Sequence, residues 1–316
     1  MKVLVTGASG FVGGAFLARA SSDGHLSLRA AVRTDVHYGS PSIESVFVEG
    51  LTATADWHEA VKGCDAVVHA AARTHIMQDT VADPLTAFRL VNAQGTLNLA
   101  RQAAEAGVQR FVYLSSVKVN GELTQMSHPF RENDIPAPQD SYAISKHEAE
   151  EGLSRLAKET GMEVVVIRPP LVYGPGVKAN FQSMIRWVRR GTPLPFGAVS
   201  NKRSFVALDN LVDFILTCLV HPKAANQTFL VADGEDFSTP ELLQRIGLAL
   251  GKPMRLVPIP PGLLQLAAGL LGKRAMLQRL CGSLQVDISK ARELLDWTPP
   301  LSVDEGLRRT VGKITP

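Results

Sequence analysis

Short hydrophobic runs alternate with amphipathic segments along the first half of this chain of 316 residues. The runs at 3–6, 28–34, 67–72 and 110–116 are dominated by Val, Leu, Ala and aromatic residues. Such runs are typical of strands in a parallel sheet that helices cover on both faces. Since the pattern continues to about Arg168, it predicts an α/β fold with a doubly wound parallel sheet.

Beyond Arg168 the pattern changes to Pro- and Gly-rich segments between short strands and helices. Thr239 is expected to cap a helix that Pro240 opens, because Pro is favoured at the first helical position. A chain of this length is expected to form about two domains. We therefore expect a first domain at 1–168, and a second, smaller one that takes up most of 169–316.

The first predicted strand leads directly into a glycine-rich turn at 7–13 with the sequence GASGFVG. Gly7 allows a tight turn, Gly10 lets backbone amides approach a pyrophosphate, and Gly13 allows the next helix to pack closely on the sheet. The N-terminus of that helix would face the phosphates with its partial positive charge. Such a turn also occurs without a ligand, but its place directly after a Val/Leu strand favours a Rossmann-like dinucleotide site.

Tyr142 and Lys146 stand four residues apart in a helical pattern, so their side chains share one helix face. An ammonium group beside a phenol favours the phenolate and lowers its pKa from about 10, which suits Tyr142 to proton transfer. Ser116 ends the predicted strand at 110–116, and ligands of parallel sheets collect at that end of the strands. Ser116 is then placed to bind a substrate oxygen. The alternatives are an exposed Tyr–Lys pair and a serine that caps a helix.

The end of the predicted strand at 28–34 bears on the choice of cofactor. An acidic residue at this point binds the adenosine ribose of NAD, but the sequence has Arg33 there. A cation favours the additional phosphate of NADP. Asp35 lies close by and Arg33 also suits a solvated turn, so the prediction of NADP(H) leaves NAD(H) open.

The composition is that of a globular protein with a mild formal charge of +3. No basic stripe indicates a nucleic-acid partner. The three cysteines, Cys64, Cys218 and Cys281, lie far apart, so we expect no disulfide framework, no metal site and a reducing, cytoplasmic location. We expect no signal peptide before the first strand. The apolar segment 262–271 is too short to span a bilayer, so no stable membrane insertion is predicted.

Several further motifs follow one another in a fixed order. They are 6–13 (TGASGFVG), 67–72 (VVHAAA), 92–99 (NAQGTLNL), Ser115–Ser116, the Tyr142/Lys146 pair, 168–176 (RPPLVYGPG) and 203–211 (RSFVALDNL). In this combination the sequence resembles the extended branch of the short-chain dehydrogenase/reductase superfamily, which contains nucleotide-sugar epimerases, dehydratases and reductases. The resemblance covers nearly the whole chain. It implies that the chain returns to the first domain near 205–219, so that the substrate-binding domain is discontinuous.

The resemblance also implies roles for individual residues. In the implied catalytic set, Tyr142 exchanges a proton with the sugar, Ser116 positions the sugar oxygen, and Lys146 binds the nicotinamide ribose. The implied cofactor-binding residues are Gly7, Gly10, Phe11, Val12, Gly13, Arg33, Leu51, Ala70, Ala71, Ala72, Asn92, Ser115, Tyr142, Lys146, Pro169 and Val172. The implied substrate-binding residues are Lys118, Asn120, Asn180, Arg203 and Arg279, and His75 is a further candidate for the sugar pocket.

Some of these positions have plain structural alternatives. Asn180 and Arg203 match positions that bind a nucleotide diphosphate, where a guanidinium suits phosphate geometry, but an N-cap and a surface cation are the alternatives. Arg279 suits a surface salt bridge equally well. Asn120 stands where many family members have Tyr, and Lys118 precedes this motif. The two residues indicate hydrogen bonds to a keto or N-acetyl group unless Lys118 is solvated.

Within the family, the motifs are most similar to bacterial enzymes that act at carbon 4 of UDP-linked N-acetylated sugars in O-antigen synthesis. The predicted reaction is the reduction of a UDP-4-keto-6-deoxy-N-acetylhexosamine to a QuiNAc- or FucNAc-type sugar. The alternative is a UDP-glucose or UDP-GlcNAc 4-epimerase with tightly held NAD. A rival of another class is a non-catalytic protein that senses the dinucleotide. The resemblance further implies a homodimer through the helix of Tyr142 and the helix after Asn92.

Overall fold

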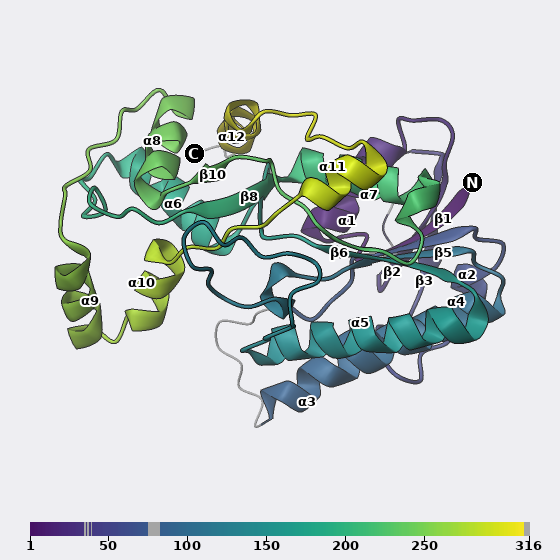
Figure 1. Cartoon of the computed structure of the whole chain (residues 1–316). Helices are drawn as coiled ribbons and strands as arrows, with labels where there is room; N and C mark the ends of the chain where they lie inside the picture. The colour runs from purple at the N-terminus through teal and green to yellow at the C-terminus, as the bar shows by residue number, and fades with distance from the viewer. Residues whose placement is uncertain (35, 37, 39, 75–82, 313–316) are drawn as a thin grey trace.

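The fold is seen in a computed structural model that describes residues 1–34, 36, 38, 40–74 and 83–312. Among these residues, seven strands form one parallel sheet in the order β3-β2-β1-β4-β5-β6-β9 (Figure 1). Their bounds are β1 Lys2–Thr6, β2 Ser27–Val32, β3 Ile43–Phe47, β4 Ala66–His69, β5 Arg110–Leu114, β6 Glu163–Arg168 and β9 Thr228–Leu230. The strand order reverses between β1 and β4, and ligands of such sheets bind beside this point. The predicted doubly wound, Rossmann-like sheet is confirmed.

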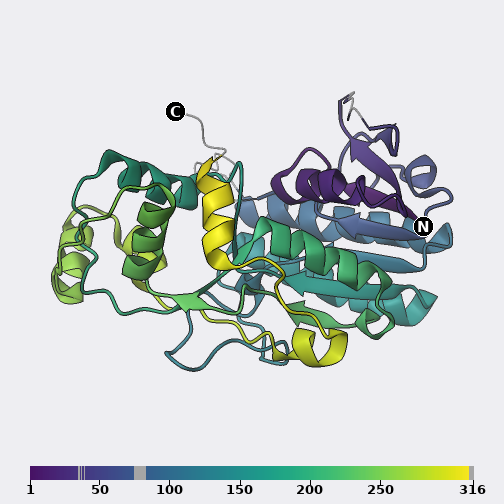
Figure 2. The ribbon, with the colours of Figure 1, turned by 90° about the horizontal axis from the view of Figure 1, so that it is seen from above.

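Helices cover both faces of this sheet (Figures 1 and 2). The helices on one face are α1 Phe11–Ala20, α7 Leu208–Val220 and α11 Ser289–Leu295. Those on the other face are α2 His58–Val61, α4 Thr96–Glu105 and α5 Ser141–Thr160, with α3 Pro84–Phe88 joined to α4 by a π-helix at Arg89–Gly95. Along β1, Val3 and Val5 pack on the first face and Leu4 on the second, so the strand is buried on both sides.

A second, three-stranded sheet has the order β10-β8-β7. Its strands are β7 Leu171–Tyr173, β8 Arg203–Ala207 and β10 Asp236–Phe237. The helices around it are α6 Ala179–Arg190, α8 Thr239–Ala249, α9 Pro261–Leu270, α10 Arg274–Cys281 and α12 Val303–Gly312, and they share a separate hydrophobic core with it. Short 3₁₀ helices lie at Val117–Val119 and Pro222–Ala224. The division of the chain into two domains at residue 168 stays a prediction.

Asp233 ties the second sheet to the helices of the first. One carboxylate oxygen accepts a hydrogen bond from the Tyr173 hydroxyl at 2.7 Å, and the other accepts from the Asn210 amide at 2.7 Å. The backbone N–H of Ala207 also donates to this carboxylate. Because these donors come from β7, from α7 and from the end of β8, the carboxylate fixes where the chain passes between the two sheets.

The start of α8 differs from the sequence prediction by one residue. Ser238 is the N-cap, since its hydroxyl accepts from the N–H of Glu241 while the Glu241 carboxylate accepts from the N–H of Ser238. The prediction that Thr239 caps this helix was therefore wrong. The Thr239 hydroxyl donates instead to the carbonyl of Leu280, because the reciprocal capping box already satisfies the helix end.

Candidate functional site

The turn between β1 and α1 has the geometry that a dinucleotide pyrophosphate requires. Gly7 has a positive φ of 67°, and the N–H of Gly10 donates to the Gly7 carbonyl at 2.8 Å. A Cβ at Gly13 would lie 2.2 Å from the Gly7 oxygen, so no larger residue fits there without moving backbone. Gly10 is the N-cap of α1 and brings no side chain, which leaves the N–H groups of the first turn open to an anion. Phe11 and Val12 form that first turn.

The loop after β4 lies directly against this turn. A Cβ at Gly7 would lie 2.8 Å from the Ala70 carbonyl and from the backbone nitrogen of Ala71. Ala70, Ala71 and the following Ala72 thus lie beside the glycine turn, where the strand order reverses. The structure brings together the two loops that the sequence assigned to the cofactor.

A buried relay below these loops was not anticipated from the sequence. The Thr6 hydroxyl lies 2.7 Å from His69 Nδ1, and His69 Nε2 lies 2.9 Å from the Thr96 hydroxyl. Burial lowers the pKa of His69 to about 3, with a smaller contribution from the charge of Lys146, so the ring is neutral. Thr6 also accepts from the N–H of Ala71 at 3.2 Å, and the relay therefore holds the β4 loop in place.

Asn92 lies in the π-helix, and its side chain binds the first turns of α5. Its amide nitrogen donates to the Ser145 hydroxyl and to the Arg73 carbonyl, both at 3.0 Å, while its oxygen accepts from the N–H of Arg73. Nearby, a Cβ at Gly95 would lie 2.8 Å from the Leu51 carbonyl, so the backbone of Leu51 is pressed against this helix. π-Helical turns are frequent at functional sites. The cofactor roles of Asn92 and Leu51 stay predictions.

The two serines after β5 point to different partners. The Ser115 hydroxyl donates to the Glu150 carboxylate in the core. Ser116 is less buried, and its hydroxyl accepts from the N–H of Lys118 at 3.2 Å as the cap of the 3₁₀ helix at Val117–Val119. That 3₁₀ helix packs against α5, so Ser116 lies next to the helix that carries the predicted catalytic pair.

Tyr142 and Lys146 lie in the first two turns of α5, as their spacing predicts. Lys146 is buried, and its ammonium donates to the Leu114 carbonyl at 2.8 Å. The same nitrogen lies 4.5 Å from the centre of the Tyr113 ring and 5.9 Å from that of Tyr142. The Tyr142 ring packs edge-on against Phe88 with the ring centres 6.2 Å apart. The end of β5 and the face of α5 thus meet at one point.

The pKa values at this point differ from the sequence prediction. Burial raises the pKa of Tyr142 well above its usual value, and the charge of Asp140 adds to the rise. Burial also lowers the pKa of Lys146 to about 7, against a smaller opposing effect of Glu150. The lowered Tyr142 pKa that the sequence predicts is not found in this structure, because burial and the charge of Asp140 together raise it. Lys146 itself is poised to change charge near neutral pH.

A buried ion pair lies close to Tyr142 and Lys146, one turn further along α5. Arg168 at the end of β6 contacts the Glu150 carboxylate at 2.6 Å, and both side chains are less than one-tenth exposed. Arg168 also donates to the amide oxygen of Asn120 at 3.0 Å, and the Asn120 nitrogen donates to the Arg131 carbonyl at 2.8 Å. Both ends of the Asn120 amide are thus bonded within the protein. A substrate contact through Asn120 stays a prediction.

Lys118 is held at the N-terminus of α5. Its ammonium forms an ion pair with Asp140 and lies 3.5 Å from Glu122. Asp140 at the same time caps α5 through the N–H of Ala143 at 2.8 Å. The pair links the segment after Ser116 to the helix of Tyr142, which gives Lys118 a positioning task beside its predicted contact with the sugar.

The remaining predicted residues lie in three places. Pro169 and Val172 follow β6, and the Pro169 carbonyl accepts from the N–H of Val117, so they border the segment after Ser116. Arg33 is exposed just beyond the end of β2.

Three further residues belong to the smaller sheet and its helices. Asn180 and Arg279 are exposed on α6 and α10. Arg203 on β8 donates to the Gly282 carbonyl at 2.9 Å, and burial lowers its pKa. Their roles in substrate binding stay predictions. His75 lies outside the described residues.

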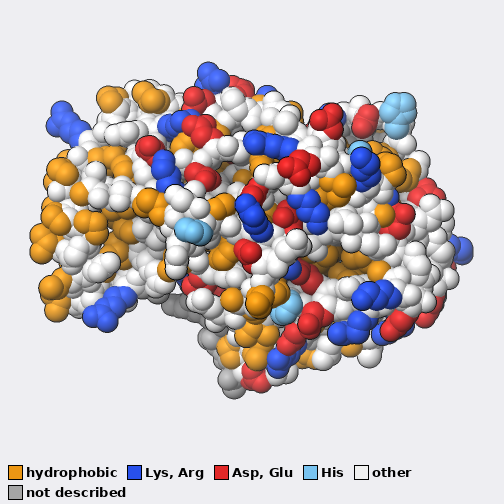
Figure 3. Space-filling view, in the orientation of Figure 1, with side chains coloured by type: hydrophobic (Ala, Val, Ile, Leu, Met, Phe, Trp, Pro, Cys, Tyr) orange, Lys and Arg blue, Asp and Glu red, His pale blue; other side chains and the backbone are white. Residues whose placement is uncertain are grey.

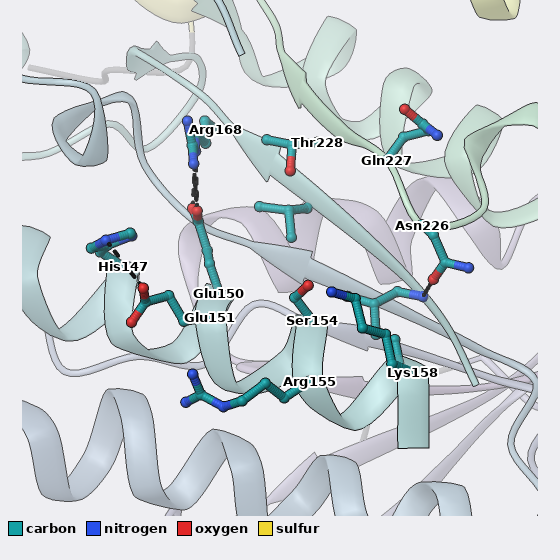
Figure 4. Close-up of a pocket in the computed structure, with 13 residues that line it drawn as sticks. His147, Glu150, Glu151, Ser154, Arg155, Lys158, Arg168, Asn226, Gln227 and Thr228 are labelled. Carbon is teal, nitrogen blue, oxygen red and sulfur yellow. Dashed lines mark hydrogen bonds and ion pairs between the residues drawn. The ribbon is translucent and has the colours of Figure 1, made fainter. Parts of the chain in front are cut away.

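An open hollow of about 700 Å³ lies between α5, β6 and the segment that leads into β9 (Figure 4). His147, Glu151 and Arg155 project from the helix, and Asn226 and Thr228 come from β9 and the segment before it. The hollow shares Glu150 and Arg168 with the buried network, but Ser116, Tyr142 and Lys146 do not line it. We assign it no role. No cluster of three or more metal-ligating side chains occurs among the residues that the structure describes.

The profile of the NAD dependent epimerase/dehydratase family matches residues 3–232. The chain belongs to this family. It is therefore an enzyme that depends on a nicotinamide dinucleotide, and the glycine turn fits that cofactor as described above.

Two relatives and one solved structure illustrate the likeness. UDP-glucose 4-epimerase of Vibrio cholerae is 48% identical over 310 residues, which cover 98% of this chain and 94% of the relative. UDP-glucose 4-epimerase of Mycolicibacterium smegmatis is 30% identical over 328 residues, with 98% and 97% coverage. The structure of UDP-N-acetylglucosamine 4-epimerase from Bacillus cereus superposes with a TM-score of 0.80 at 21% identity and covers 100% of both chains, which confirms the fold.

Proposed function

We propose that this epimerase/dehydratase family member is a 4-epimerase of UDP-linked hexoses, which interconverts sugars that differ only in the configuration of carbon 4. The observation that carries the proposal is the 48% identity, across 98% of the chain, with the Vibrio cholerae protein named UDP-glucose 4-epimerase. It favours the epimerase over the 4-reductase that the motifs alone placed first. The reductase is the second candidate.

The residues at the end of β5 and on α5 suit the chemistry at carbon 4. Tyr142 accepts the proton of the C4 hydroxyl as that carbon becomes a ketone, and gives a proton back to the oxygen when the ketone is reduced. The Ser116 hydroxyl donates to the same oxygen and holds it in place. A nicotinamide dinucleotide held at the β1–α1 turn would supply a reversible hydride acceptor for carbon 4. Inversion without net oxidation would require that the ketone be reduced on the face opposite to the one that was oxidised.

Lys146 brings a positive charge close to these proton movements. Its pKa of about 7 leaves it partly protonated at neutral pH, and its ammonium lies 5.9 Å from the centre of the Tyr142 ring, where a positive charge favours the phenolate. The bond to the Leu114 carbonyl fixes the ammonium at the end of β5. Lys146 thus acts on the phenol through the electric field and not through a direct bond.

The charge of the segment from the end of β6 to the end of β8 supports an anionic substrate. No Asp or Glu occurs at 164–208, whereas Lys178, Arg186, Lys202 and Arg203 do. Guanidinium and ammonium groups bind diphosphates through charge-assisted hydrogen bonds. The predicted phosphate contacts of Arg203 and Asn180 lie within this acid-free stretch.

One observation favours the reductase. Arg33 follows β2 at the position where an acidic residue holds the ribose of NAD, and its exposed cation suits the additional phosphate of NADP. A reductase would consume NADPH, whereas an epimerase leaves its dinucleotide unchanged. The two candidates are therefore separated by cofactor balance.

The test incubates the purified protein with UDP-glucose and, separately, with UDP-GlcNAc, and follows formation of the C4 epimers by chromatography. We expect an equilibrium mixture of epimers with no loss of added NADH or NADPH. Stoichiometric NADPH oxidation with a UDP-4-keto-6-deoxy-N-acetylhexosamine, without epimer formation, would establish the reductase instead. Binding of dinucleotide without turnover of any of these sugars would favour the non-catalytic sensor.

A further inference from the structure

Helix α9 presents a row of leucines to solvent at one end of the molecule. Leu263, Leu266 and Leu270 are 60%, 65% and 82% exposed, and Leu271 after the helix is 69% exposed. Residues three and four apart lie on one helix face, so the three helical leucines form a single stripe. We call these four leucines the α9 surface. Figures 1 and 2 place α9 at the end of the molecule away from the N-terminus.

The opposite face of α9 is the one that packs against the protein. Leu264 contacts the core of the second sheet, and Ala268 is buried. These two residues are also four apart, so α9 is held by its own inward stripe. The outward leucines are instead 60% to 82% exposed. A contiguous patch of exposed large apolar side chains marks an interaction surface.

The chain segment that contains α9 carries charges of one sign. No Asp or Glu occurs between Glu241 and Asp287. The exposed cations in this stretch are Lys252, Arg255, Lys273, Arg274 and Arg279. Figure 3 shows hydrophobic side chains gathered along the left edge, over α9, with a basic group beside them. The surface is therefore apolar and cationic.

We propose that the α9 surface docks reversibly on an anionic phospholipid bilayer. Amphipathic helices with leucines on one face and flanking Lys and Arg lie in the interface plane, where the apolar face enters the headgroup region and the cations meet anionic lipids. α9 has 10 residues and is roughly 15 Å long, half the thickness of a hydrocarbon core. Among the described residues, no helix is long and apolar enough to cross a membrane. The contact is therefore peripheral.

Charge complementarity favours lipid over a second copy of this chain. In a symmetric contact between two copies the same patch meets itself, which would bring the cations of both α9 surfaces together without any carboxylate between Glu241 and Asp287 to offset them. An anionic bilayer offsets the same cations and covers the same leucines. This inference does not depend on the proposed epimerase reaction.

The test measures cosedimentation of the full chain with vesicles of phosphatidylcholine alone and of phosphatidylcholine with phosphatidylglycerol. The variant Leu266→Glu/Leu270→Glu places charges on the stripe without touching the inward face. Val220→Glu, at the end of α7, is the matched control, since Val220 is 66% exposed and lies outside this surface. Thermal unfolding checks that each variant is folded.

We expect binding to the anionic vesicles that falls with added salt, little binding to phosphatidylcholine, and at least about tenfold weaker binding of the double variant but not of the control. Equal binding of wild type and double variant, or no binding to anionic vesicles, would overturn the proposal. The proposal would also be overturned if wild type and control sedimented as dimers, the double variant as a monomer, and none bound vesicles. That outcome would assign the surface to a second copy.

Discussion

The ammonium of Lys146 donates to the carbonyl oxygen of Leu114 at 2.8 Å, which fixes the start of α5 to the end of β5. The two residues are 32 positions apart in the chain, and Leu114 lies two residues before Ser116. The buried ammonium also faces the ring of Tyr113 at 4.5 Å. The hydrogen bond therefore sets the place of the predicted catalytic lysine, while burial lowers its pKa.

The lowered pKa of Lys146 predicts a pH-dependent stability. Between pH 7 and 10 the unfolded chain binds a proton that the folded chain has lost, so the free energy of unfolding rises with pH in this window. The rise from this one group is at most roughly 4 kcal/mol. Urea unfolding of wild type and Lys146→Met at several pH values measures it. We expect the free energy of unfolding of the wild type minus that of Lys146→Met to increase from pH 7 to 10, and a constant difference would show that the pKa is not lowered.

Tyr142→Phe is expected to lower kcat by about 10²- to 10⁴-fold and to leave dinucleotide binding intact, because only the proton-transferring hydroxyl is removed. Epimer formation and cofactor fluorescence measure the two effects. Tyr173→Phe is the matched control: it removes a hydroxyl that bonds Asp233, so it should cost about 1 kcal/mol of stability and change kcat less than about tenfold. Full turnover by the Tyr142 variant would disprove the assigned role.

The features that were predictable from the sequence are those that depend on residues close together in the chain. The run from β1 through Gly7 and Gly13 to α1 contains its own turn geometry, and a four-residue spacing places Tyr142 and Lys146 on one helix face. Both elements therefore appear in the structure where the pattern placed them.

The features that were missed join distant parts of the chain. Thr6, His69 and Thr96 meet only once β1, β4 and α4 have packed, and Glu150 meets Arg168 only where α5 crosses β6. The burial of a side chain also depends on contacts between distant parts of the chain. A Tyr–Lys spacing shows the charge beside a phenol, but it does not show how much water is lost around both groups, which here decides the pKa.

The buried pair of Glu150 and Arg168 predicts a large effect of removing one partner. Glu150→Gln should lower the free energy of unfolding by about 3 to 5 kcal/mol, because it leaves a buried guanidinium without its carboxylate. Asp209→Asn breaks the half-exposed pair with Arg309 and should cost less than about 1 kcal/mol. Urea denaturation compares the two variants. Equal, small losses would show that the buried pair is easily replaced by water.

The glycine turn predicts a steric effect at Gly13. Gly13→Ala would place a Cβ 2.2 Å from the Gly7 carbonyl, so we expect a loss of about 1 to 3 kcal/mol in stability and at least about tenfold weaker dinucleotide binding. Gly262→Ala in α9, where the new Cβ meets no described atom within 4 Å apart from its chain neighbours and its own helix backbone, should leave binding unchanged. Calorimetric titration with NADH and NADPH gives both affinities. Undisturbed binding by the Gly13 variant would contradict the pyrophosphate site.

Arg33 predicts which dinucleotide the protein prefers. Its exposed guanidinium beyond β2 would pair with a 2′-phosphate, so Arg33→Asp should weaken NADPH binding by about tenfold or more and strengthen NADH binding through the ribose hydroxyls. Arg101→Asp, which makes the same charge change on the exposed side of α4, controls for the overall field. If both variants change the two affinities alike, or neither does, Arg33 does not select the cofactor. A wild type that already prefers NADH would then agree with a redox-neutral epimerase.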